Sequence, residues 1–98
     1  MNVTSISLSG LQAASTRLDA AAHNIANSQT PGFRRDVVAQ QTQEQEGVLT
    51  VVGKAQEVGP DLAADLVEQM QATYSYRANL RAIEAKNRMS GSLLDIQA

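Results

Sequence analysis

The chain has 98 residues, of which 43% are hydrophobic, 18% charged and only 3% aromatic. This length fits a single domain, residues 1–98, and a chain so short buries only about 60% of its unfolded surface, so its core must be small. The absence of cysteine excludes disulfides and thiolate metal sites, and a net charge of −2 argues against a nucleic-acid partner. No apolar run reaches the ~18 residues of a membrane span, and the N-terminus does not resemble a cleaved signal peptide.

Residues 4–28 are rich in alanine and predict a first helix. Its apolar residues Leu11, Leu18 and Ile25, with alanines between them, alternate in steps of three and four, which is the spacing of a helix-pairing seam. Gly10 lies inside this segment and predicts fraying of the first two turns, because glycine costs roughly 1 kcal/mol in a helix interior. Pro31 forces the preceding residue out of the helical region and ends the helix.

Residues 30–59 have no helical period and predict a turn and linker with a short β-hairpin or extended segment. Residues 48–52 are β-branched and bounded by glycines, so they read as a strand. Residues 37–39 are its expected partner, with the turn near residues 45–47. An isolated two-stranded hairpin is marginal in water, so we expect this one to lean on the helices or on a neighbouring molecule.

Residues 60–96 predict a second, longer helix, with Pro60 at its first position and Asp61 and Asp65 favoured by the helix dipole. The fold class is therefore mainly α, with two long antiparallel helices pairing as a coiled-coil-like hairpin. The seam predicted for this pair consists of Leu11, Leu18, Ile25, Leu62, Leu66, Tyr76, Leu80, Ile83 and Leu94.

The long helix carries a second apolar stripe well over 100° from Leu80. Its members step by seven and four residues: Val67, Tyr74, Ala78, Ala85, Met89 and Ile96. One interpretation is a surface that tolerates alanine and methionine. The other is a self-association face, which leads either to a closed symmetric oligomer or to an open array.

The residues give little support to enzymatic chemistry. His23 reads either as a solvated helix residue or as a general base, but no nucleophile candidate lies near it in the helix. Asp61 and Asp65 read either as a dipole-favoured pair or as a metal pair, but no histidine follows at ligand spacing. We therefore expect no catalytic, cofactor or metal site, no small-molecule substrate and no nucleic acid.

The junction from Asn24 to Arg35 is the most distinctive segment of the chain. Thr30-Pro31-Gly32 places an extended residue, a fixed φ and a permissive φ in succession, and Phe33 follows directly. Asn24 and Asn27 lie one turn apart, where their amides can reach the last helical carbonyls or bond across to another helix. From spacing alone, the segment is either an ordinary helix stop with a hydrophobic latch or a functional turn.

These residues resemble a known family. Asn24-Ile25-Ala26-Asn27, followed by Thr30-Pro31-Gly32-Phe33-Arg34, resembles the N-terminal signature of bacterial flagellar rod and hook-type axial proteins. Asp61-Leu62-Ala63, Tyr76-Arg77-Ala78-Asn79 and Leu93-Leu94-Asp95-Ile96 are similar to the terminal helix of that family. The two matched blocks cover roughly residues 9–36 and 61–96.

The resemblance implies a structural subunit that self-assembles through its terminal helices and serves flagellum-dependent motility. Its implied partners are further copies, other rod and hook axial proteins and the flagellar type III export apparatus, and its implied location is the basal body. Asn24, Ile25, Asn27, Thr30, Pro31, Gly32 and Phe33 would form the turn that meets the next subunit. Leu62, Tyr76, Asn79 and Leu94 would hold the terminal helix in the tube wall.

The short middle segment favours a small proximal-rod type, because only about 25 residues separate the matched blocks and no outer domain fits between them. The alternative is a stand-alone homo-oligomeric relative, a helical hairpin with an adaptor or regulatory role.

Overall fold

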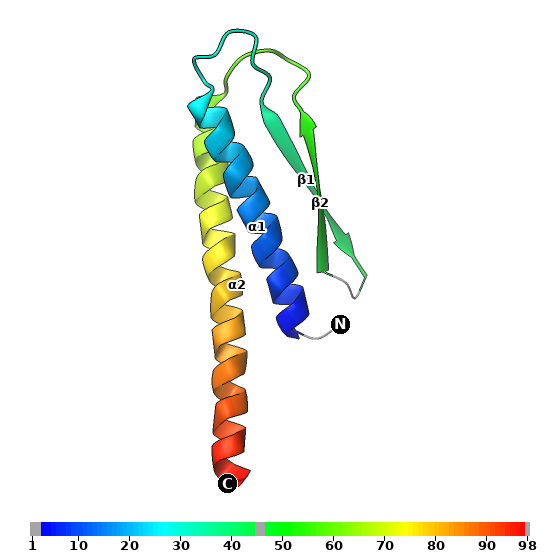
Figure 1. Ribbon diagram of the computed structural model, residues 1–98, viewed down its shortest axis with the longest axis vertical. Coiled ribbons are helices and arrows are strands. Elements are labelled where there is room, and N and C mark those ends of the chain that lie inside the picture. The colour runs from blue at the N-terminus through cyan, green and yellow to red at the C-terminus, as the bar shows by residue number, and fades with distance from the viewer. Residues whose placement is uncertain (1–2, 45–46, 98) are drawn as a thin grey trace.

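The computed structural model describes residues 3–44 and 47–97, with side chains for residues 4–44 and 47–93 (Figure 1). Helix α1 spans Val3–Ala26, strand β1 spans Asp36–Gln43, strand β2 spans Gly47–Lys54 and helix α2 spans Leu62–Gln97. Helix α1 lies between α2 and the hairpin, and the molecule measures 63 × 24 × 14 Å. The predicted mainly helical fold, with a short antiparallel hairpin between two helices, is confirmed.

The helix ends differ slightly from their predicted positions. Helix α1 ends at Ala26 instead of residue 28, in a turn where the Asn27 N–H donates to the His23 carbonyl at 3.0 Å. Helix α2 begins at Leu62, not at Pro60. Asp61 caps it instead, because its carboxylate accepts a hydrogen bond from the Ala64 N–H at 3.2 Å.

Small side chains make the contact between the two helices. The buried apolar residues of the described chain are all alanines: Ala13, Ala14, Ala20, Ala21 and Ala72. Helix α2 contributes to this contact a row at heptad spacing, formed by Asp65, Ala72, Asn79 and Lys86. The row closes at its far end with a hydrogen bond from Lys86 Nζ to Thr4 Oγ1 at 2.8 Å.

Gly10 allows α1 and α2 to approach each other closely and, contrary to the prediction, it does not interrupt the first turns of α1. A β-carbon built at Gly10 would lie 2.5 Å from Oδ1 of Asn79, so only glycine leaves room for that side chain. The Asn79 amide is held in place by donating to the Ser75 carbonyl at 2.8 Å. The helix continues without interruption from Gly10 back to Val3.

The structure corrects the predicted seam of α2. Leu11, Leu18, Ile25 and Ile83 are half-buried, whereas Leu62, Leu66, Tyr76 and Leu80 are 40–48% exposed. Leu94 lies outside the residues whose side chains are described. The physical reason is that α1 approaches α2 too closely for large side chains, so α2 is turned to present its small and polar row.

The hairpin pairs antiparallel over eight residues, from Asp36 opposite Lys54 to Gln43 opposite Gly47. The turn residues 45 and 46 lie outside the described part of the chain. Val38, Val48 and Thr50, on the face toward α1, are half-buried. The other face is exposed and mostly apolar, and we call it the hairpin outer face: Val37, Ala39, Gln41, Leu49 and Val51.

A serine on α1 holds the far end of the hairpin. The Ser9 hydroxyl accepts from the Val48 N–H at 2.7 Å and donates to the Val48 carbonyl at 3.0 Å. Gly47 beside it has φ of 95°, and a β-carbon there would lie 2.6 Å from Ser9 Oγ. The hairpin is therefore fitted closely against α1, as expected for a two-stranded sheet that cannot stand alone.

Candidate functional site

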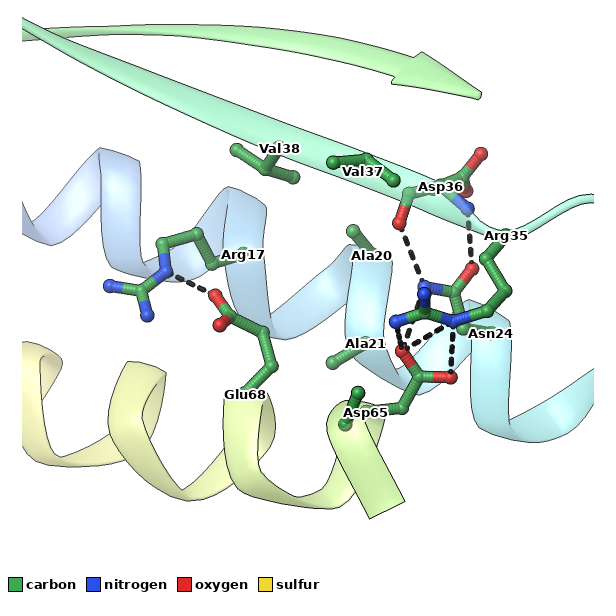
Figure 2. Close-up of a pocket in the computed structure, with 11 residues that line it drawn as sticks. Arg17, Ala20, Ala21, Asn24, Arg35, Asp36, Val37, Val38, Asp65 and Glu68 are labelled. Atoms are coloured by element: carbon green, nitrogen blue, oxygen red, sulfur yellow. Dashed lines mark hydrogen bonds and ion pairs between the residues drawn. The ribbon is translucent and has the colours of Figure 1, made fainter. Parts of the chain in front are cut away.

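A buried polar cluster joins all three parts of the molecule at the end of α1. It consists of Asn24 from α1, Arg35 just before β1 and Asp65 from the first turn of α2, and we call it the junction cluster (Figure 2). The Asp65 side chain is only 2% exposed. Arg35 Nε lies 3.1 Å from both carboxylate oxygens, and Arg35 Nη2 also donates to Oδ1. Such a forked contact is the strong form of an arginine–carboxylate pair.

The side-chain amide of Asn24 bonds α1 to the backbone at the start of β1. Its Oδ1 accepts from the Asp36 N–H at 2.7 Å, and its Nδ2 donates to the Asp36 carbonyl at 2.9 Å. The same Nδ2 lies 3.3 Å from Asp65 Oδ1. Asn24 therefore satisfies both backbone groups of Asp36 and touches the carboxylate, which explains why a polar side chain occurs in the helix contact.

The charge of Arg35 is fixed by this arrangement. The hydrogen bond to Asp65 raises the pKa of Arg35 above its ordinary value; attraction to Asp65 and Asp61 adds to this, and burial opposes it. Since the folded state raises this pKa, the associated stability is fully present below the ordinary value and is lost only as the pH rises through the folded value. Arg35 therefore stays charged across neutral pH.

The turn after α1 is held by successive side-chain and backbone bonds. Asn27 Nδ2 donates to the His23 carbonyl at 2.9 Å, and Thr30 Oγ1 donates to Asn27 Oδ1 at 3.2 Å. The Phe33 N–H then donates to the Thr30 carbonyl at 3.3 Å. Gly32 has φ of 74°, a conformation that side chains other than glycine rarely adopt.

Phe33 is the anchor of this turn. Its ring meets the His23 ring edge-on with centroids 5.4 Å apart, and Lys54 Nζ lies 5.4 Å from the ring centroid. Asp36 is ion-paired with Lys54 and lies 3.8 Å from His23 Nε2. His23 is exposed and contacts a ring and a carboxylate, so the geometry gives it a structural position.

A pocket of about 180 Å³ lies beside the junction cluster, between α1, β1 and α2 (Figure 2). Arg17 and Glu68 form an ion pair across one side of it, and Arg35 and Asp65 close the other. Four of the charged groups lining the pocket are thus ion-paired with one another, and the fifth, Asp36, is ion-paired with Lys54. In the described residues no group of three His, Cys, Asp or Glu side chains could hold a metal ion. Chemically, the site is a clamp between segments.

The comparison with protein families concerns the helix and turn that contribute Asn24 to this clamp. Residues 5–34 match the family model described as flagella basal body rod protein. The match places this segment in the flagellar basal body rod family. It covers most of α1 and the turn through Phe33, and it supports a structural role in the basal body rod. A search of curated proteins gave no match to the chain.

The rod-family segment contains every residue that the sequence pattern predicted for the turn. Asn24, Asn27, Thr30 and Phe33 are connected as described, while Pro31 and Gly32 are exposed at the bend and Ile25 is half-buried. The expectation that an asparagine amide bonds across to another helix holds for Asn24, which reaches Asp65. Asn27 bonds to a carbonyl of its own helix end.

Three residues of the site were not predicted. From the sequence, Arg35 is placed only at the end of the junction segment, Asp65 is interpreted only as a dipole-favoured acid or one of a metal pair, and no role is predicted for Asp36. Their relation depends on packing between segments 30 positions apart in the chain. The available signal was the heptad row of Asp65, Ala72, Asn79 and Lys86, which places Asp65 on the same helix face as a buried alanine.

The second apolar stripe is uncovered in the single chain. Val67, Tyr74 and Met89 are more than half exposed, Ala78 and Ala85 are also exposed, and Ile96 lies beyond the described side chains. None of the described helices is both long and apolar enough to span a membrane.

Proposed function

We propose that this chain is a structural subunit of the flagellar rod that assembles with copies of itself and with other axial proteins. The observation that carries the proposal is the apolar stripe of α2, which remains exposed on a chain whose N-terminal segment matches the rod family. Tyr74 is 77% exposed and Met89 is 67% exposed. Contiguous apolar surface of this kind typically marks a site of protein association.

The junction cluster supports the same proposal in a different way. A subunit in a tube must hold its segments at fixed angles, because small errors accumulate from copy to copy. Asp65, Arg35 and Asn24 fix the hairpin and both helices relative to one another. We propose that the subunit reaches the rod through the flagellar export apparatus without a cleaved signal peptide, and that it serves motility.

The cellular test is deletion of the gene followed by complementation. We expect deletion cells to be non-motile, with basal bodies that lack or shorten the rod, and the tagged protein to copurify with basal bodies. Motile deletion cells with normal basal bodies would contradict the proposal. A discrete closed oligomer that never copurifies with basal bodies would favour the alternative, a stand-alone relative with an adaptor role.

The biochemical test introduces charge into the stripe. Ala78→Glu and Ala85→Glu change exposed side chains, so we expect the helical circular dichroism spectrum to be retained and self-association to be lost. Ala22→Glu, the same change at an exposed alanine of α1, is the matched control and should associate normally. Normal association of both α2 variants would show that the stripe is only surface.

A further inference from the structure

Two unlike surfaces lie on opposite sides of this molecule. Because α1 separates α2 from the hairpin, α2 turns one side away from α1 and the hairpin turns its outer face away in the other direction (Figure 1). At 100° per residue, Met70, Tyr74, Arg77, Arg81 and Arg88 all lie within about 40° of the direction opposite Ala72, the residue buried against α1. We call these five residues the α2 outer face.

The α2 outer face is divided along its length. Its upper part, near the junction, carries the exposed side chains of Met70 and Tyr74. Its lower part carries Arg77, Arg81 and Arg88, which form no ion pair within the described residues. Aromatic residues, methionine and arginine are the types enriched in protein interfaces.

The hairpin follows the same order, with apolar side chains on its outer face above and an acidic residue at its lower end. Its upper and middle parts carry Val37, Ala39, Val51 and Leu49, all exposed. Glu44 follows directly at the end of β1, at the tip of the hairpin beyond the paired residues, and residues 37–53 contain no Lys or Arg. The carboxylate of Glu44 forms no ion pair with the described side chains.

Along the long axis of the molecule, the change from apolar to charged residues occurs at the same level on α2 and on the hairpin. Val37 and Glu68 both line the junction pocket, so the upper end of the hairpin is level with the first turns of α2. Ser9 binds Val48 near the hairpin tip, and its neighbour Gly10 packs against Asn79. Seven strand steps cover about 23 Å, the same length as roughly 15 residues of helix. Glu44 therefore lies near the height of Arg81.

From this match we propose that the hairpin outer face of one copy packs on the α2 outer face of a second copy in the same orientation, displaced sideways. The contact pairs apolar with apolar in the upper part and Glu44 with Arg77 and Arg81 in the lower part. A two-fold contact between α2 faces would leave the hairpin face uncovered. The unlike contact covers both faces and repeats from copy to copy, giving a ring or an open array.

This inference rests on the proposed self-assembly, but an experiment can exclude the proposed contact without excluding self-assembly. The chain contains no cysteine, so introduced thiols report single positions. Val51→Cys and Met70→Cys place thiols at the same height on the two faces. With a short bismaleimide, we expect each variant alone to stay monomeric on a denaturing gel, their mixture to give one dimer band, and the double variant to give a ladder.

Three results would overturn the contact. Dimers of Met70→Cys alone would indicate α2 against α2, and dimers of Val51→Cys alone would indicate hairpin against hairpin. The absence of cross-links in protein that sediments as an oligomer would exclude both faces while leaving the proposed function intact. A chain that sediments as a monomer at every concentration would instead count against self-assembly itself. Ser15→Cys, exposed on α1, combined with Met70→Cys is the matched control and should give no ladder.

A charge exchange tests the lower part of the contact. We expect Glu44→Lys and Arg81→Glu each to raise the apparent dissociation constant for self-association by about tenfold, because each places like charges together. The two changes in one chain should restore association, because the introduced lysine of one copy then meets the introduced glutamate of the next. Glu57→Lys reverses an exposed acid at the other end of the molecule and should have no effect. Failure of the double variant to recover would refute the pairing.

Discussion

Asp65 is the residue at which the helices and the hairpin meet. A carboxylate buried to this degree is costly unless it is ion-paired and hydrogen-bonded, and here Arg35 and Asn24 supply both. Arg35 in turn precedes β1 directly, so the ion pair transmits the position of α2 to the hairpin. The junction cluster therefore fixes the angle between the hairpin and the two helices.

We expect Asp65→Ala to lower the free energy of unfolding by about 2–4 kcal/mol, because it leaves Arg35 without its partner in a partly buried site. Chemical denaturation followed by circular dichroism measures this change. Asp19→Ala, at an exposed acid of α1, is the control and should change stability by less than about 0.5 kcal/mol. Equal effects of the two substitutions would mean that the junction cluster contributes nothing to folding.

Gly10 gives a second prediction at this scale. Gly10→Ala improves helix propensity by up to about 1 kcal/mol. It also drives a methyl group into the Asn79 amide, a form of overpacking that typically costs about 1–3 kcal/mol. We therefore expect a net loss of stability for Gly10→Ala, and recovery when Asn79→Ala is added. A double-mutant cycle with no coupling would show that the close approach has no energetic role.

At the scale of elements, the hairpin is attached to α1 by two polar side chains at its two ends. Asn24 binds Asp36 at the start of β1, and Ser9 binds Val48 near the tip. Each hydrogen bond of this kind contributes about 0.5–1.5 kcal/mol. The hairpin should therefore open more easily than the helix pair.

We expect the Ser9→Ala, Asn24→Ala double variant to release the hairpin while the helices remain paired. Amide hydrogen exchange should then accelerate by about tenfold or more in residues 36–43 and 47–54, with a smaller change in the middle of α1 and α2. Thr16→Ala, which removes a hydrogen bond within α1 only, is the control. Uniform acceleration throughout the chain would mean that the hairpin and helices unfold as one unit.

The elements themselves could be predicted from the sequence because their signals are local. Pro31 ends one helix, the β-branched run at residues 48–52 forms a strand, and alternating apolar steps predict the helices. The face that α2 turns toward α1 could not be predicted in this way. A leucine row looks like a seam, yet the contact uses Ala72 and Asn79, because closeness of the backbones excluded the larger side chains.

The same distinction applies to the site. The turn residues from Asn24 to Phe33 form a contiguous motif, and sequence reasoning found them. Asp65 and Arg35 acquire their roles only when distant segments pack together, and charge alone could not pair them. The helical period of the sequence predicts that α2 carries apolar residues on two sides. It does not identify the molecule that covers the exposed stripe.

At the scale of the whole molecule, the chain is long and thin, with a Cα radius of gyration of 17.3 Å. Its buried apolar residues, within the described part of the chain, are alanines, while large side chains such as Met70 and Tyr74 are exposed. A monomer built in this way buries little of the surface that stabilises folded proteins. Association therefore has large apolar side chains to cover that folding leaves exposed.

We expect the melting temperature of the wild-type chain to rise with protein concentration, because association binds the folded state and not the unfolded one. Ala78→Glu should melt at the same temperature at every concentration. Differential scanning calorimetry over a roughly hundredfold range of concentration measures both. A melting temperature of the wild type that does not change with concentration would show that the folded chain is stable without neighbours.

The heptad row of α2 has a consequence for alignment of the two helices. An alanine contact is nearly uniform along its length, so by itself it would permit α2 to slide past α1 by seven residues. Such a slide would bring Ala72 opposite Asn24, separate Asp65 from Arg35 and remove Asn79 from the space beside Gly10. The contacts of Asp65 with Asn24, of Asp65 with Arg35 and of Asn79 with Gly10 therefore select one longitudinal alignment of the helices from several of similar apolar content.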